Sequence, residues 1–336
     1  MKFPRWLAGL LATASVLSLT AAPAEASQSL VDVQRQVIKL QQDAASSAEG
    51  AQAAKVQLAA LNRTLSGIRQ QASSQGETVA ALRKSLGSIA IEQYKSGGLG
   101  QGLELLFSSD PTLYLSSAGS LASITRRKGI QLRKYSAAQQ RLNATSMTIN
   151  DKVALVRVTQ NRLLAQSAQA AAKLKDVEKL LSKLKKSDRI RLAKLTQAAN
   201  DRAQKSSLVF AKTTGGLSGR AGIAIRYALK QIGDRYVFGA AGMTYWDCSG
   251  LTMRAYQAAG VSLPHSASAQ ANYGRRVSLN SLKPGDLVFF GSPISHNGIY
   301  LGGGKMVDAP HSGARVRVES FGAHFGRLRF VVARRF

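Results

Sequence analysis

One cysteine lies where the sequence could give it a chemical role. Cys248 is the only cysteine of the chain and follows Asp247, a good helix-capping residue, just before an apolar-periodic stretch at 251–259. This order predicts that Cys248 occupies the first turn of a helix, where the helix dipole and free backbone N–H groups favour a thiolate. A thiolate there could attack a carbonyl group, and nearby N–H groups could hold the resulting oxyanion.

A thiolate nucleophile needs a base, and His296 is the best-placed histidine. It begins an apolar, strand-like run, and Asp308 ends the next such run, twelve positions later. A hairpin turning through the three glycines at 302–304 would bring His296 and Asp308 roughly opposite each other. A carboxylate in that position would fix the tautomer of the imidazole and stabilise the imidazolium.

Blander interpretations of the same residues stay open at this point. Cys248 could be an inert buried thiol, and Asp308 could be a solvated or capping carboxylate, in which case His311 is the rival third member. His265 and His324 are expected at the surface or at the rim of a cleft.

The elements that would position these residues lie in the last third of the chain. Residues 218–336 hold all four histidines and the cysteine, and about 120 residues suffice for one independent domain. A helix is expected at 221–231, and short strands are expected at 287–290, 298–302, 315–319 and 329–332. The pattern predicts an α+β domain.

A long helical region precedes this domain. A seven-residue ladder of apolar residues runs from 30 to 89, and a second runs from 149 to 184, neither broken by proline. Glycines near 97–100 and one or two short helices at 103–115 would separate the ladders. The simplest arrangement is an antiparallel coiled-coil hairpin, the arm, over 27–193, and the alternative is a parallel homodimer. Residues 194–217 are expected to form a linker.

The first 26 residues resemble a secretory signal peptide, with a basic start, an apolar stretch at 7–19 and a small-x-small site at 24–26. The stretch is shorter than the ~20 residues of a membrane span, although an uncleaved anchor is the alternative. The net charge of +28 predicts binding to a polyanion. In a secreted, envelope-associated protein, anionic cell-wall polymers are the expected partner, and nucleic acid is not. A single cysteine excludes an internal disulfide and a multi-thiolate zinc site.

Five segments together resemble the NlpC/P60 family of papain-like cell-wall peptidases. They follow the order and spacing of that family through residues 218–336. The matching segments are Arg235-Tyr236-Val237-Phe238-Gly239, Asp247-Cys248-Ser249-Gly250-Leu251, Val261-Ser262-Leu263-Pro264-His265-Ser266, the run 282–290, and His296 through Pro310.

The resemblance implies an α+β papain-like peptidase domain in which Cys248 attacks, His296 is the base and Asp308 orients it. It implies that Tyr236, Asp247 and Ser249 help to bind substrate, with no metal or organic cofactor. The implied substrate is the peptidoglycan stem peptide, cut between D-glutamate and the diamino acid. The helical region is similar to the arm of division-associated hydrolases, which implies restraint of the peptidase and docking on a membrane-bound division complex.

The sequence departs from the family pattern at several positions. Asp308 stands where histidine is more common, Asn297 where an apolar residue is preferred, and Phe238 and Ala240 where Trp and Gly are usual. Two other functions are weighed against the peptidase. One is an amidase or acyltransferase of the same fold on another envelope substrate, and the other is a catalytically silent coiled-coil scaffold or activator.

Overall fold

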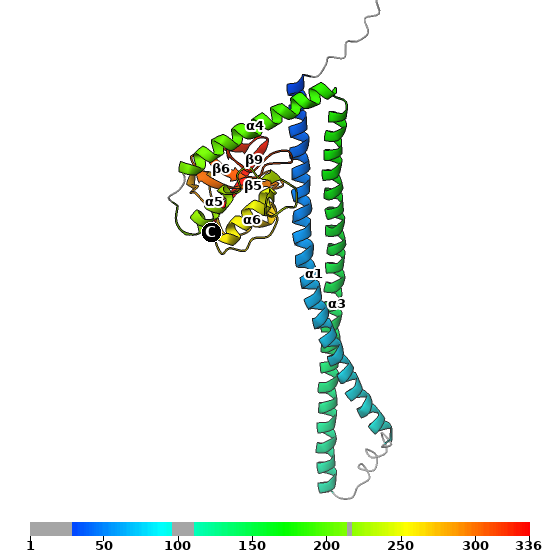
Figure 1. Cartoon of the computed structure of the whole chain (residues 1–336). Helices are drawn as coiled ribbons and strands as arrows, with labels where there is room; N and C mark the ends of the chain where they lie inside the picture. Colours follow the sequence, from blue (N-terminus) through cyan, green and yellow to red (C-terminus); the bar gives the residue numbers. More distant parts are fainter. Residues whose placement is uncertain (1–28, 96–110, 214–216) are drawn as a thin grey trace, which may run out of the picture.

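A computed structural model describes residues 29–95, 111–213 and 217–336. A two-helix arm runs along one side of the molecule, and a third long helix crosses from the arm to a compact C-terminal domain (Figure 1). The predicted signal peptide and most of the tip of the hairpin lie outside the described residues. None of the described helices has the length and apolar character that a membrane span requires.

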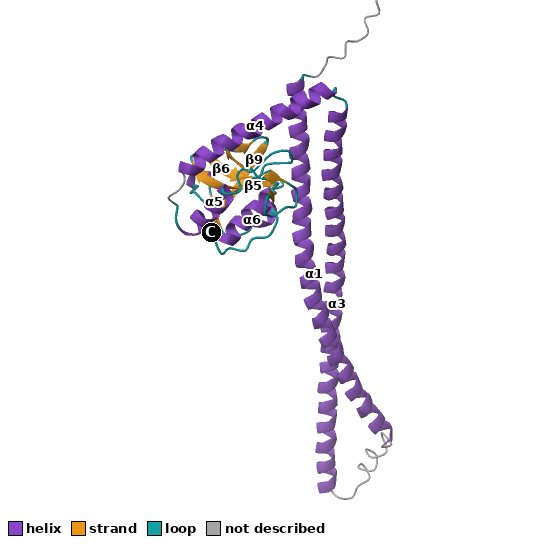
Figure 2. Cartoon of the chain, viewed as in Figure 1, coloured by secondary structure: helices purple, strands orange, loops and turns teal. Residues whose placement is uncertain are grey.

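The arm is an antiparallel pair of helices, α1 (Leu30–Lys95) and α3 (Pro111–Ser182) (Figure 2). At 1.5 Å per residue, each is on the order of 100 Å long. The seam is built from apolar ladder residues, including buried Val33, Ala51 and Leu65. The structure therefore has the expected hairpin within a single chain.

The second helix of the arm begins earlier than the second ladder predicts. Pro111, expected inside a short helix at the tip, is instead the first residue of α3. Proline suits this position because its missing N–H would have no partner in the first turn and its φ angle is already helical.

The expected linker is also different, because residues 194–213 belong to a continuous helix, α4 (Lys186–Thr213). Asn200 Nδ2 donates to the carbonyl oxygen of Gly313 (3.2 Å), and the backbone N–H of Val318 donates to Ser207 Oγ (2.8 Å). The helix thus lies along β7 (Arg317–Ser320), a strand at the edge of the sheet. It gives a partner to an edge N–H that would otherwise face solvent. The sequence lacks an apolar ladder here because α4 packs on a sheet edge rather than in a helix pair.

The C-terminal domain has the expected α+β architecture. Its antiparallel sheet has the order β3-β9-β4-β5-β6-β7, and β8 pairs with β9. Two further strands, β1 and β2, form a separate parallel pair. The elements are α5 (Gly219–Leu229), β1 (Arg235–Tyr236), β2 (Tyr245–Trp246), α6 (Cys248–Ala258), α7 (Ala267–Gln270), β3 (Arg275–Val277), a 3-10 turn (Leu279–Ser281), β4 (Leu287–Phe290), β5 (His296–Gly302), β6 (Lys305–Asp308), β7 (Arg317–Ser320), β8 (His324–Phe325) and β9 (Leu328–Arg335).

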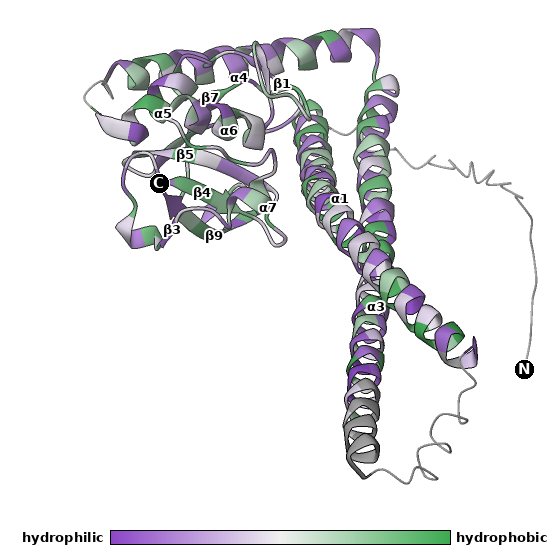
Figure 3. Cartoon of the chain, turned by 90° about the horizontal axis from the view of Figure 1, so that it is seen from below, coloured by the Kyte–Doolittle hydropathy of each residue, from purple (hydrophilic) through white to green (hydrophobic). Residues whose placement is uncertain are grey.

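The core lies on both faces of the central strand β4, whose four residues are all buried. Leu287 and Phe289 pack with α5 and α6 in one cluster, whereas Val288 and Phe290 pack in a second cluster on the other face. Figure 3 shows the resulting concentration of hydrophobic residues on β4. This core fixes β5 beside β4 and holds α6 against the sheet, which places the starts of α6 and β5 close together.

Candidate active site

Cys248 is the first residue of α6, as the sequence predicts. Asp247 caps the helix because its Oδ1 accepts from the backbone N–H of Gly250 (2.6 Å), and its Oδ2 accepts from the N–H of Gly239 (2.8 Å). Position 250 requires glycine, since a Cβ atom there would lie 2.3 Å from the carbonyl oxygen of Ala240. The capping aspartate and the glycine therefore set the direction in which the thiol points.

His296 and Asp308 form a buried pair. The distance from His296 Nε2 to Asp308 Oδ2 is 2.8 Å, and the β5–β6 hairpin brings them together as expected. The imidazole stacks on Phe325, with ring centroids 4.9 Å apart and an interplanar angle of 10°. The carboxylate holds Nε2, so Nδ1 is the ring nitrogen left for the thiol.

His311, the rival third member, has another partner. Its Nδ1 lies 2.8 Å from the backbone carbonyl oxygen of Ser312. Burial lowers the pKa of His311 to about 4, so the ring is neutral near pH 7. The structure pairs Asp308, not His311, with His296.

The three residues expected to bind substrate lie around the cysteine. Tyr236, Asp247 and Ser249 are all buried. Burial, followed by the charges of Cys248, Asp247 and Glu49, raises the pKa of Tyr236 well above 10, so the phenol stays neutral. The structure brings these residues and the catalytic candidates into one site, and the role of each stays a prediction.

His265, expected at the surface or at the rim of a cleft, lies within the site and pairs with Asp247. Its Nε2 lies 2.9 and 3.0 Å from the two carboxylate oxygens of Asp247. Burial lowers its pKa, but the hydrogen bond and charge of Asp247 outweigh burial and leave the pKa above 6.5. Because histidine and aspartate are distant in sequence, only folding reveals the pair. His324, by contrast, is exposed on β8.

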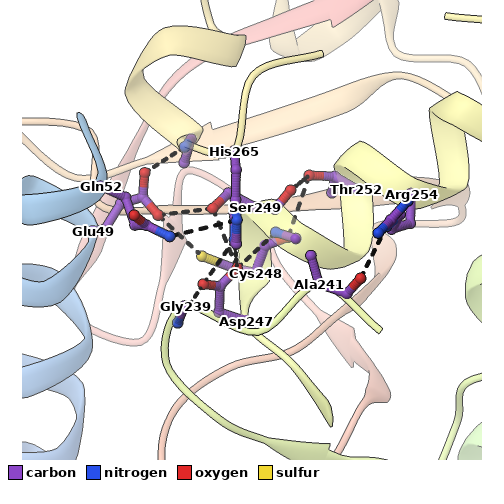
Figure 4. Close-up of polar contacts among 12 residues, drawn as sticks. Glu49, Gln52, Gly239, Ala241, Asp247, Cys248, Ser249, Thr252, Arg254 and His265 are labelled. Atoms are coloured by element: carbon purple, nitrogen blue, oxygen red, sulfur yellow. Dashed lines mark hydrogen bonds and ion pairs between the residues drawn. The ribbon is translucent and has the colours of Figure 1, made fainter. Parts of the chain in front are cut away.

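Sequence reasoning missed Glu49, a residue of the arm that lies in the site (Figure 4). Glu49 is 2% exposed, its Oε2 accepts from Ser249 Oγ (3.0 Å), and its Oε1 accepts from the backbone N–H of Ala267. Next to it, Gln52 Nε2 lies 3.4 Å from Nδ1 of His265. One signal was available, because Glu49 is the only acidic residue between positions 44 and 76 of a strongly basic chain.

The docked arm changes the state expected for the thiol. Cys248 is 4% exposed, and its Sγ lies 4.0 Å from Glu49 Oε2. Burial, then the charges of Glu49 in its ionised form and of Asp247, raises the pKa of Cys248 well above 9, although backbone N–H groups of Asn297 and Ser249 act in the opposite direction. Within the described part of the chain, the thiol has its side-chain hydrogen bond with Glu49 and not with His296. The helix start alone predicted a thiolate, whereas burial, together with Glu49 of the arm, favours the neutral thiol.

Asn297, a polar residue where the family pattern is apolar, has found buried partners. Its Nδ2 donates to Gln270 Oε1 (2.7 Å) and to Thr252 Oγ1 (3.1 Å). Gln270 in turn donates to the carbonyl oxygen of Ser249 (2.8 Å). This network joins α6, α7 and β5, so Asn297 takes part in holding the site together.

Across the described ranges there is no group of three or more His, Cys, Asp or Glu residues placed to hold a metal.

A cysteine at a helix start whose sulfur meets the backbone N–H of Asn297, the residue after a histidine that a buried carboxylate orients, has the elements of a thiol hydrolase site. Residues 233–335 match the NlpC/P60 family. A probable endopeptidase of Mycobacterium tuberculosis is 46% identical over 103 residues, which span 31% of this chain and 27% of that protein. The probable endopeptidase p60 of Listeria monocytogenes is 46% identical over 93 residues, spanning 27% of this chain and 19% of that protein.

Solved structures also match part of the chain. NlpC2 from Trichomonas vaginalis is 25% identical with a TM-score of 0.33, and the match covers 36% of this chain and 48% of that one. A mutant of the Resuscitation Promoting Factor Interacting protein RipA is 29% identical with a TM-score of 0.31, covering 38% and 64%. The C-terminal domain is an NlpC/P60 domain, and this family is one of cysteine peptidases. The chain spans about a quarter of the length of the curated relatives it matches.

Proposed function

We propose that the protein is a secreted cysteine endopeptidase that cuts the stem peptides of peptidoglycan, between D-glutamate and the diamino acid, during cell-wall remodelling or separation of daughter cells. The observation that carries the proposal is the buried His296–Asp308 pair in an NlpC/P60 domain whose one cysteine, Cys248, begins α6. The signal-peptide pattern supports secretion, and the charge of +28 supports retention on anionic wall polymers.

In the proposed mechanism, Nδ1 of His296 takes the proton of the Cys248 thiol, and Sγ attacks the carbonyl carbon of the scissile amide. Backbone N–H groups at the start of α6 stabilise the oxyanion. The imidazolium protonates the leaving amine, the C–N bond breaks, and a thioester remains. His296 then deprotonates a water molecule, which attacks the thioester, and the proton returns to the sulfur as the shortened peptide leaves. Asp308 holds the imidazole in the required tautomer throughout.

We also propose that the conformation with the docked arm is inactive. The arm buries the nucleophile, and a substrate must displace Glu49 and Gln52 to reach it. A partner that pulls on the arm, such as a membrane-bound division complex, would release the site.

A pair of matched variants tests both proposals. Ala45 of α1 packs against the core of the domain, so Ala45→Trp should push the arm away, whereas Ala59→Trp makes the same change at an exposed position of the same helix. Each variant is incubated with purified peptidoglycan, and the released peptides are identified by mass spectrometry. We expect Ala45→Trp to release at least tenfold more peptide than the wild type or Ala59→Trp.

Adding Cys248→Ala to the Ala45→Trp chain should abolish release. If a folded Ala45→Trp chain releases nothing from walls of several compositions, the endopeptidase proposal fails and the silent scaffold is favoured. The new chain ends identify the bond that is cut, and ends outside the stem peptide would favour the amidase or acyltransferase alternative.

A further inference from the structure

Two carboxyl groups, those of Glu49 and Asp247, lie within hydrogen-bond distance of the Ser249 hydroxyl group. Ser249 Oγ lies 3.0 Å from Glu49 Oε2 and 3.3 Å from Asp247 Oδ1. Both carboxyl groups are buried, with exposed fractions of 2% and 1%. A serine hydroxyl carries one proton and can donate it to only one acceptor at a time. If both carboxyl groups were ionised, two buried negative charges would share this one donated proton, and their repulsion would oppose docking of the arm.

A proton on Glu49 resolves this conflict. Protonation would reverse the hydrogen bond that Ser249 Oγ otherwise donates to Glu49 Oε2, so that Glu49 donates to Ser249 and Ser249 donates onward to Asp247 Oδ1, while Oε1 still accepts from the N–H of Ala267. Asp247 keeps its other donors, Gly250 N–H and Gly239 N–H. Asp247 therefore has donors besides Ser249, and a proton on Glu49 removes the second buried charge.

The other charged or titratable groups around Glu49 do not remove the need for this proton. They are Cys248 and Asp247 at the start of α6, Tyr236 on β1, His265 before α7, and Lys55 on α1. His265 is already paired with Asp247, and both belong to the domain, so the arm supplies neither member of that pair. Lys55 is exposed on the surface of the arm. Glu49 is the group whose surroundings change completely when the arm leaves.

We propose that docking of the arm on the active site is coupled to uptake of a proton by Glu49, so that the enzyme is held closed at low pH and released as the pH rises. The proposal rests on the endopeptidase function proposed above and names its regulation. Glu49 acts as a gate and takes no part in the chemistry.

The expected size of the effect follows from the two environments of the carboxyl group. Burial, followed by the charge of Asp247, raises the pKa of docked Glu49 from 4.5 to about 7, against the opposing hydrogen bonds of Ala267, Ser249 and Ser266. An undocked arm returns the carboxyl group to water and to its ordinary pKa. Between the two values only the docked state keeps the proton, so the docking equilibrium weakens roughly tenfold per pH unit, or about 300-fold from below pH 4.5 to above pH 7.

Spin-label distances can test the gate without depending on catalysis. The full chain carries Cys248→Ala and two labelled cysteines at exposed positions, Arg63→Cys on α1 and Asn280→Cys on the domain. The distance distribution is measured from pH 5 to pH 9. We expect a single docked distance at low pH and a growing undocked population as the pH rises.

Two variants sharpen the test. Glu49→Gln is uncharged at every pH and can make the hydrogen bonds of the neutral acid, so it should stay docked throughout. Glu92→Gln makes the same change at an exposed position of α1 and should behave as the wild type. The proposal is overturned if the wild-type distance does not change with pH, or if Glu49→Gln opens as the wild type does.

Peptide release is then measured with the wild type and the two glutamate variants, which carry the native Cys248 and no labelled cysteines. These rates separate this proposal from the peptidase proposal. We expect Glu49→Gln to release at least tenfold less peptide than the wild type at pH 8 and to match it at pH 5. If the labelled arm opens with pH but no variant releases peptide, the gate stands and the endopeptidase function fails. If Ala45→Trp is active but Glu49→Gln and wild type have equal activity at pH 8, the function stands and the gate fails.

Discussion

Replacing Asp308 by asparagine tests the catalytic assignment most directly. The change swaps one oxygen for an NH2 group in a fully buried side chain whose Oδ2 lies 2.8 Å from His296 Nε2. Asparagine can offer its NH2 group to Nε2, which favours the tautomer with the proton on Nδ1. In that tautomer Nδ1 cannot accept the proton of Cys248. The charge that stabilises the imidazolium is also lost.

The loss should fall on turnover and not on binding. Asp308 contacts His296 from within the sheet, so KM should change little, whereas kcat should fall by about 10³ to 10⁴, the loss typical of a misoriented catalytic histidine. This corresponds to about 4 to 5.5 kcal/mol of activation free energy. Folding should survive, because Asp308 Oδ1 has no hydrogen-bond partner in the described structure and the substitution is isosteric.

The assay compares rates of peptide release in the Ala45→Trp background, where the arm does not limit the rate. His311→Gln is the matched control, because His311 is neutral and bonded to a backbone carbonyl group, and it should lower kcat by less than tenfold. The assignment is refuted if Asp308→Asn loses less than tenfold in kcat, or if His311→Gln loses as much as Asp308→Asn.

Three further substitutions test the packing and charges around the site. Tyr256→Phe removes the hydroxyl that donates to the buried carbonyl oxygen of Gly285 and should cost about 1–2 kcal/mol in urea unfolding, and an unchanged midpoint would contradict this. Arg327→Ala breaks an ion pair with Asp43, and the two side chains are 54% and 33% exposed. Arm docking, measured with the spin labels, should therefore weaken by no more than about fivefold. The difference from the wild type should vanish in high salt. Burial, then the charge of Asp308, raises the pKa of Glu319 to about 7 against the opposing ion pair with Arg317, so ionisation of Glu319 opposes folding at higher pH. Glu319→Gln should raise the melting temperature at pH 8 but not at pH 4, and the reverse pattern would refute this.

The most accurate sequence predictions concern residues whose relation is local. Asp247 and Cys248 are adjacent, so helix-capping preferences were enough to place the thiol at a helix start. His296 and Asp308 are separated by one tight turn, and strand alternation was enough to bring them together. The α4 helix was missed because its partner is a sheet edge far along the chain, which leaves no periodic signal in its own sequence.

The sequence by itself determined where the candidate catalytic residues lie, because helix capping places Cys248 at the start of α6 and hairpin geometry pairs His296 with Asp308. Tertiary structure alone decided the state of these residues. Glu49 lies 199 positions before Cys248, and nothing local to either residue relates them. Packing of the Ala-rich part of α1 against the domain desolvates the thiol and places a carboxyl group beside it. Desolvation and like-charge repulsion depend on what surrounds a group in space, and so only the folded chain shows that the site is covered.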